Sequence, residues 1–120
     1  MAHKNRAPEK KAPIYIYVTE DAKAEFATYA AEFGLDETAL ANLLIAREQR
    51  VGSLRGLDDA VLRLPGRTEK IVARIPAERH RAFESTAKDL GFKVSEAGAL
   101  LVSLELQLRW LDRSIGLDSD

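Results

Sequence analysis

Hydrophobic positions along the chain form two kinds of pattern, one typical of strands and one typical of helices. Residues 14–18 (IYIYV) and 70–75 (KIVARI) are short runs rich in β-branched and aromatic side chains, which favour strands. A helix-start signal follows each run: Thr19 before two acidic residues, and Pro76 two residues before Glu78. We therefore expect each strand to lead directly into a helix.

Apolar residues at helical spacing continue after both signals. The first helix is predicted to run to Phe33 and is followed by Gly34, and its later counterpart reaches Leu90 and is followed by Gly91. Glycine is the residue that most readily adopts the left-handed conformation found after the last turn of a helix. Two helix ends are therefore predicted at these glycines.

A second helix is predicted after each glycine. Thr38 and Ser95 are the expected N-caps, because a hydroxyl oxygen can accept a hydrogen bond from a free backbone N–H of the first turn. The two helices are expected over about 39–50 and 96–114, with Gly116 ending the later one. The predicted order is strand, helix, helix, linker, strand, helix, helix.

The second half of the chain repeats the first at an offset of 57 residues, without a gap. A unit of this size is too small to bury a core of its own, so two copies predict an internal pseudo-dimer. The identical pairs are Ile14 with Ile71, Phe26 with Phe83, Ala30 with Ala87, Gly34 with Gly91, Leu43 with Leu100, Leu44 with Leu101 and Glu48 with Glu105.

This repeat divides the chain into five expected parts. They are a disordered basic arm (1–12), copy one (13–50), a linker with a weak helical pattern (51–68), copy two (69–116) and a tail (117–120). A lone strand leaves its backbone groups unpaired. The expected fold class is therefore mainly α with a short two-stranded antiparallel β-ribbon.

Alternation along the two strands assigns each side chain to one face of the ribbon. The inward side chains are expected to pack on Phe26, Phe83, Leu43, Leu44, Leu100 and Leu101; they are Ile14, Ile16 and Val18, and Ile71, Ala73 and Ile75. The outward face is predicted to present Tyr15, Tyr17, Lys70, Val72 and Arg74. The two copies differ at these outward positions.

A short strand, a helix, a glycine turn and a helix with Ser or Thr at its start resemble the ribbon-helix-helix (Arc/MetJ-type) family, here as a tandem on one chain. The resemblance rests on residues 14–18 with Thr19, Phe26, Ala30, Gly34 and Thr38, and on residues 71–75 with Pro76, Phe83, Ala87, Gly91 and Ser95. It implies an antiparallel ribbon that enters the major groove of duplex DNA above four interlocked helices. It also implies that amides at the start of the second helices hold phosphates.

The outward residues are the predicted DNA-reading set. Arg74 is the expected base reader, because a guanidinium can bond guanine O6 and N7 in a bidentate manner. Lys70 is expected to meet a phosphate, and Tyr15, Tyr17 and Val72 to contact base edges. The alternative interpretation is that these three apolar or aromatic side chains form a protein interface. Because the two strands differ, an asymmetric DNA site is predicted.

Phosphate contacts are expected at the second helices and in the N-terminal arm. Lys93 beside Ser95 favours an anion, whereas Asp36 and Glu37 beside Thr38 repel one. The alternative is that the two hydroxyl groups only cap their helices. The predicted phosphate contacts are Thr38, Lys93, Ser95, Lys10 and Lys11, with Lys4 and Arg6 in the same arm.

Composition narrows the function classes. A net charge of −1 over 120 residues argues against a strongly electrostatic nucleic-acid binder. The chain has no cysteine, and neither His3 nor His80 has ligand partners at metal spacing. It also has no signal-like region and no apolar run long enough to span a membrane. We expect a cytoplasmic protein that is not an enzyme, with no cofactor, metal, membrane or small-molecule substrate.

The C-terminal helix has more apolar residues than one face requires. They are Leu100, Leu101, Leu104, Leu108 and Leu111 in one stripe, with Val102, Leu106 and Trp110 beside it. Two interpretations remain open: a wide core face covered in part by linker residues 54–64, or an assembly surface for a second copy or a protein partner.

The leading hypothesis is a duplex-DNA-binding protein. It would act as a transcriptional repressor, or as an accessory factor in plasmid or mobile-element maintenance or DNA transfer. The alternative is a protein-interaction module of the same fold that has lost DNA binding, which the near-neutral charge and the apolar ribbon face favour.

Overall fold

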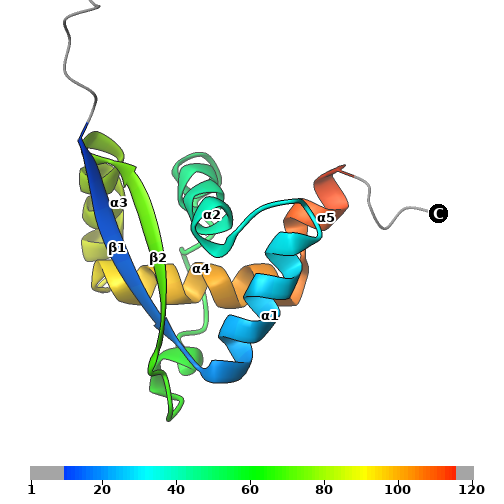
Figure 1. Ribbon diagram of the computed structural model, residues 1–120. Helices are drawn as coiled ribbons and strands as arrows, with labels where there is room; N and C mark the ends of the chain where they lie inside the picture. The colour runs from blue at the N-terminus through cyan, green and yellow to red at the C-terminus, as the bar shows by residue number, and fades with distance from the viewer. Residues whose placement is uncertain (1–9, 116–120) are drawn as a thin grey trace, which may run out of the picture.

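The computed structural model describes residues 10–115, and Figure 1 shows how they are arranged. Within this range the chain is mainly helical and has one two-stranded antiparallel sheet. The elements are strand β1 (Lys11–Val18), helices α1 (Glu20–Ala31) and α2 (Glu37–Val51), the 3₁₀ helix η2 (Ala60–Arg63), strand β2 (Glu69–Pro76), and helices α3 (Ala77–Asp89), α4 (Val94–Leu108) and α5 (Trp110–Ile115). The predictions for His3, Lys4, Arg6, Gly116 and the tail lie outside the described residues.

β1 and β2 pair along their whole length and form a ribbon, with Tyr15 opposite Val72 at its middle. Every second residue of the central part of each strand is buried, as the alternation predicted. The buried residues are Ile14, Ile16 and Val18 in β1, and Ile71, Ala73 and Ile75 in β2. Because an isolated two-stranded ribbon is only marginally stable in water, this buried face needs a layer of helices against it.

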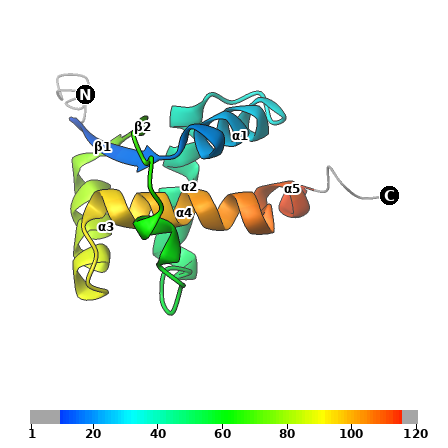
Figure 2. The same cartoon turned by 90° about the horizontal axis from the view of Figure 1, so that it is seen from below.

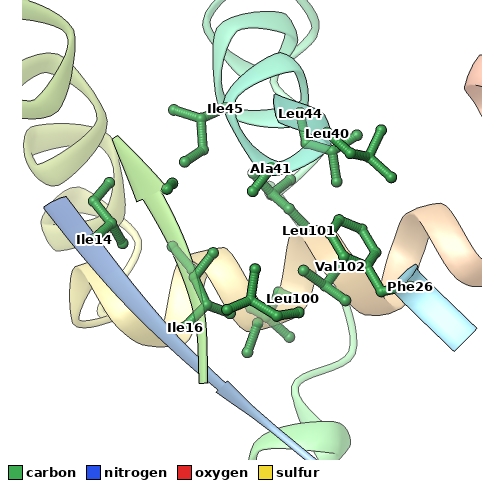
Figure 3. Close-up of a cluster of buried hydrophobic side chains, with 14 of the residues drawn as sticks. Ile14, Ile16, Phe26, Leu40, Ala41, Leu44, Ile45, Leu100, Leu101 and Val102 are labelled. Atoms are coloured by element: carbon green, nitrogen blue, oxygen red, sulfur yellow. The ribbon is translucent and has the colours of Figure 1, made fainter. Parts of the chain in front are cut away.

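The helices supply that layer. Figure 2 shows α4 crossing beside the ribbon, with α2 and α3 extending away from it on the far side of α4. In Figure 3 the side chains of Ile16, Phe26, Leu40 and Leu101 converge from β1, α1, α2 and α4. These four and Phe83 of α3 are at most 2% exposed, so the core lies between the ribbon and the helices.

Gly98 allows α4 to approach the ribbon closely. A Cβ atom at this position would lie 2.6 Å from Cγ1 of Ile16 and 2.9 Å from its Cδ1. A glycine inside a helix costs about 1 kcal/mol relative to alanine. At Gly98 the absence of a side chain lets the α4 backbone pack directly on Ile16, a buried side chain of β1.

Leu43 is outside the core, contrary to the prediction. Its side chain is 47% exposed, whereas Leu100, its partner in the repeat, is 2% exposed. The difference follows from the linker, because Leu57 and Val61 line the same hollow as Leu100 on α4. Part of the apolar stripe on the C-terminal helix is thus covered by the linker, as one of the two interpretations expected.

Thr38 and Ser95 are not the N-caps of α2 and α4, which begin earlier than predicted. The N-cap of α2 is Asp36, whose carboxylate accepts a backbone N–H of the first turn at 2.8 Å. Lys93 has that position in α4, and the side chain of Glu96 accepts its backbone N–H at 2.9 Å. The N-caps, Asp36 and Lys93, thus lie two residues before the predicted Thr38 and Ser95.

The long helix predicted over 96–114 is interrupted. α4 ends at Leu108, and Arg109 adopts the left-handed conformation with φ of 51° before α5 begins. The backbone N–H of Leu111 donates to the carboxylate of Glu105 at 2.8 Å, which replaces a helical backbone partner. The interruption is thus stabilised by a side chain within α4.

The remaining boundaries are close to those predicted. β1 begins at Lys11, so Lys11 and Ala12 belong to the ribbon rather than to the predicted arm. Thr19 is the N-cap of α1, and its hydroxyl oxygen accepts a first-turn N–H at 3.1 Å. Gly34 and Gly91 have the predicted positive φ values, 73° and 87°.

Candidate functional site on the outer face of the ribbon

The outward face of the ribbon holds all five side chains that were predicted to face a groove. Tyr15 and Tyr17 are 43% and 42% exposed, Lys70 and Arg74 are exposed, and Val72 is half-buried. They alternate with the buried positions of the same strands, so they project from the side that the helices leave uncovered. The ribbon therefore presents an aromatic and basic surface to solvent.

The two cations of this face have different surroundings. Nζ of Lys70 lies 4.9 Å from the centroid of the Tyr15 ring, a cation–π contact worth about 0.5–1 kcal/mol at an exposed site. Arg74 lies opposite Pro13, toward the other end of the ribbon. Within residues 10–115 its guanidinium has no ion-pair partner. Arg74 is thus available to an outside acceptor.

Two polar side chains of α2 fix the backbone of β2. Oγ1 of Thr38 donates to the carbonyl oxygen of Val72 at 2.6 Å, and Oδ1 of Asn42 accepts the N–H of Arg74 at 2.9 Å. These bonds satisfy backbone groups on the edge of β2 that does not pair with β1. They also use the hydroxyl hydrogen of Thr38 within the protein, although the sequence suggested this group for a phosphate.

The start of α2 is more acidic than the start of α4. Asp36 and Glu37 stand at the start of α2, and Glu37 pairs with Nζ of Lys23 at 2.7 Å. α4 starts after Lys93, and Ser95 lies half-buried in its first turn. Glu96 also lies in this first turn and accepts the N–H of Lys93, but Lys93 offsets its charge, whereas α2 starts with two carboxylates. α4 is therefore the more favourable of the two ends for a phosphate.

Further cations lie at both ends of the ribbon. Lys10 and Lys11 are exposed where β1 begins, and the carbonyl of Lys10 accepts the N–H of Ala77 at 3.1 Å. At the opposite end, Nη1 of Arg67 donates to the carbonyl of Tyr17 at 3.2 Å. Arg67 was not predicted from the sequence, since its partner is 50 residues away. Its only local signal is a cation just before the second strand.

A buried polar network, which was not predicted from the sequence, holds the helices together. Glu105 is fully buried, and its carboxylate accepts hydrogen bonds from Tyr29 at 2.5 Å, from Arg47 at 2.7 Å and from the N–H of Leu111 at 2.8 Å. Burial, together with the bond to Glu105, raises the pKa of Tyr29 well above its ordinary value. The one sign of this network in the sequence is that Glu48 matches Glu105 in the repeat, where most other identical pairs are apolar.

Arg109 extends this network toward solvent. Its guanidinium bonds Asp112 at 3.0 Å and Glu32 at 2.8 Å, and it lies 4.5 Å from the centroid of the Tyr29 ring. The bond to Asp112 is the main cause that raises the pKa of Arg109. The network thus joins α1, α2, α4 and α5 through paired charges, and its chemistry is that of a structural anchor.

The described residues contain neither a metal-binding cluster nor a membrane-spanning helix. Among residues 10–115, no three acidic or histidine side chains are grouped closely enough to hold a metal ion. No helix of the described region is long and apolar enough to cross a membrane. Comparisons with protein-family models, with curated proteins and with solved structures find no match for the chain.

Proposed function

We propose that the chain is a single-chain ribbon-helix-helix pseudo-dimer that binds duplex DNA through the outer face of β1 and β2. The observation that carries this proposal is the exposed face with Arg74, Lys70 and two tyrosines, backed by a helical layer. A two-stranded ribbon fits the major groove, where each base pair has a distinct pattern of donors and acceptors. Arg74 is the proposed base reader, and Lys70 the proposed phosphate contact.

The spacing of the elements supports the duplication on which this proposal depends. α2 and α4 have 15 residues each and begin 57 positions apart, at the offset of the sequence repeat. Their C-caps, Gly52 and Arg109, are also 57 positions apart, and both are left-handed. Tyr15 and Val72 match in the repeat and lie opposite each other in the ribbon, as a two-fold relation between the copies requires.

The two buried glutamates support the same relation. Glu48 accepts the N–H of Leu54 at 2.9 Å, and Glu105 accepts the N–H of Leu111 at 2.8 Å. In both cases the donor is six residues after the glutamate and just beyond the left-handed C-cap. Equivalent bonds at equivalent positions favour two copies of one unit.

The charges around the ribbon indicate how DNA would lie on it. Lys93 at the start of α4 favours a phosphate, whereas Asp36 and Glu37 at the start of α2 disfavour one. DNA would therefore be held more firmly on the α4 side, with Lys10 and Lys11 adding contacts at one end of the ribbon. This asymmetry predicts a site without inverted symmetry. Such a protein would act as a repressor, or as an accessory factor in plasmid or mobile-element maintenance or transfer.

Selection of bound duplexes from a random-sequence library at low salt tests this proposal. We expect one enriched motif without inverted symmetry, and an affinity that falls as salt rises because bound cations displace counterions. Lys70→Ala should reduce the slope of that salt dependence by about one unit, as expected for one lost phosphate contact. If the selection enriches no sequence at low salt, that result would contradict DNA recognition. If the enriched motif is a perfect palindrome, it would contradict the predicted asymmetry.

A second function is favoured by one feature of the same face. Pro13, Tyr15, Tyr17 and Val72 make much of the outward surface apolar, and apolar exposed patches are common at protein interfaces. The alternative is thus a protein-interaction module that keeps this fold without DNA binding. Absence of duplex affinity even at low salt would favour this alternative.

A further inference from the structure

A cavity of about 310 Å³ lies at one end of the ribbon, and Tyr17 is the one residue that it shares with the proposed DNA face. Its walls come from the end of β1, the first turns of α1, the segment that contains η2, and α4. The apolar part of the wall is formed by Val18, Ala22, Val61, Leu64, Val102 and Leu106. A volume near 300 Å³ is at the lower end of those of small-molecule sites, so it suits a compact ligand.

The linker makes this cavity different from the hollow lined by residues at positions 57 residues away. Val61 and Leu64 close one side of it, and both belong to the linker. The positions 57 residues from Ala22 and Leu106 are Arg79 and Gln49, and these line a different hollow. That hollow has polar walls and no linker residue among those that line it. The linker residues thus distinguish the apolar cavity from the hollow at the equivalent positions.

Arg67 gives the cavity its charge. The side chain is half-buried among the lining residues, and one of its N–H groups donates to the carbonyl of Tyr17 at 3.2 Å. No carboxylate of residues 10–115 lies within salt-bridge distance of it. Glu25 also lines the cavity, but its side chain is exposed to water. A guanidinium has five N–H donors arranged to match a carboxylate, so Arg67 has donors to spare.

From these observations we infer that the cavity binds a small amphipathic organic anion. The apolar body lies on Val18, Val102 and Leu106, and the carboxylate bonds the guanidinium of Arg67. Arg67 also bonds the carbonyl of Tyr17, and Tyr17 both lines the cavity and contributes its ring to the outer face. A ligand in the cavity therefore changes the surroundings of this end of the ribbon. The binding step itself does not depend on the proposed DNA function.

Titration of the full chain with sodium octanoate tests this inference, with backbone amide shifts in NMR as the measurement and no DNA present. We expect saturable one-to-one binding with shifts centred on Val18, Ala22 and Val102. Arg67→Gln should weaken binding at least tenfold, Arg67→Lys should weaken it less, and 1-octanol should bind more weakly than octanoate. Arg63→Gln is the matched control, because Arg63 is exposed, pairs with Asp59 and does not line the cavity.

Three results would overturn the inference. They are a linear, unsaturated response up to 10 mM octanoate, equal binding by wild type and a folded Arg67→Gln variant, and shifts centred elsewhere on the protein. Circular dichroism of each variant establishes that it is folded. The octanoate titration contains no DNA, so its result is the same whether or not the protein binds DNA. Failure of the proposed function and failure of this inference are therefore distinguishable.

Discussion

The hydroxyl group of Tyr29 in α1 donates to the carboxylate of Glu105 in α4 at 2.5 Å, and both side chains are buried. This bond joins two residues that are 76 positions apart in the chain. A buried carboxylate is stable only while donors replace the water that it has lost. The Tyr29–Glu105 pair therefore links the position of α1 to that of α4, the helix that packs on β1.

Tyr29→Phe is predicted to lower the free energy of unfolding by about 1–3 kcal/mol, because a buried charged acceptor loses a donor while the ring is kept. Urea denaturation followed by circular dichroism measures the change. Tyr17→Phe is the matched control: its ring is 42% exposed, and we expect a change below about 0.5 kcal/mol. Equal stability of Tyr29→Phe and wild type would show that the bond does not support the fold.

Stability is predicted to fall at alkaline pH through the same tyrosine. The pKa of Tyr29 is raised above its ordinary value of 10.0, first by burial and then by the bond to Glu105. A group with a raised folded-state pKa contributes its stability fully below the unfolded pKa and loses it as pH rises toward the folded pKa. Unfolding free energies measured above about pH 10 should therefore fall more steeply for wild type than for Tyr29→Phe. Parallel profiles would contradict this assignment.

Replacing the two buried glutamates should have unequal effects. Glu105 pairs with Arg47 at 2.7 Å. Among the described residues, Glu48 accepts hydrogen bonds only from Ser53 and Leu54, which follow the end of its own helix. Glu105→Gln breaks a buried ion pair, and we expect a loss of about 3 kcal/mol. Glu48→Gln should cost less by the same denaturation measurement. A larger loss for Glu48→Gln would mean that local bonds dominate over the pair between helices.

Gly98→Ala is predicted to destabilise the fold by about 1–3 kcal/mol, the usual cost of overpacking a core. The added Cβ would meet Ile16 at 2.6 Å, which forces α4 or β1 to move. The Ile16→Ala background is the control, because it removes the two side-chain atoms nearest that Cβ. There Gly98→Ala should cost much less. An equal cost in both backgrounds, measured by thermal or urea unfolding, would rule out the contact as the cause.

Local patterns predicted much of this fold. The alternation around Ile14 and Ile71 predicted the buried face of the ribbon, and the positive φ of Gly34 and Gly91 followed from their place after an apolar helical run. The interruption at Arg109 could not be predicted in that way, since left-handed non-glycine residues are uncommon. Besides the local bond from Leu111 to Glu105, Arg109 bonds Glu32, which is 77 residues away and which only the tertiary structure brings near.

The candidate site was predictable to a similar extent. Which side chains of the two strands face outward followed from period-two alternation, and the structure places Tyr15 and Arg74 on one face. The role of Thr38 did not follow, because its partner Val72 lies 34 residues away in another element. Arg67 was missed for the same reason, and so was the cavity that it lines with the linker.

The affinity of Arg74→Ala for a selected duplex tests the central claim most directly. Fluorescence anisotropy at low salt would compare it with wild type and with Arg50→Ala, which alters an exposed arginine in the last turn of α2, far along that helix from its contacts with β2. We predict that Arg74→Ala binds at least about fivefold more weakly, while Arg50→Ala binds like wild type. Equal affinity of the Arg74→Ala and wild-type proteins would contradict DNA binding through the ribbon.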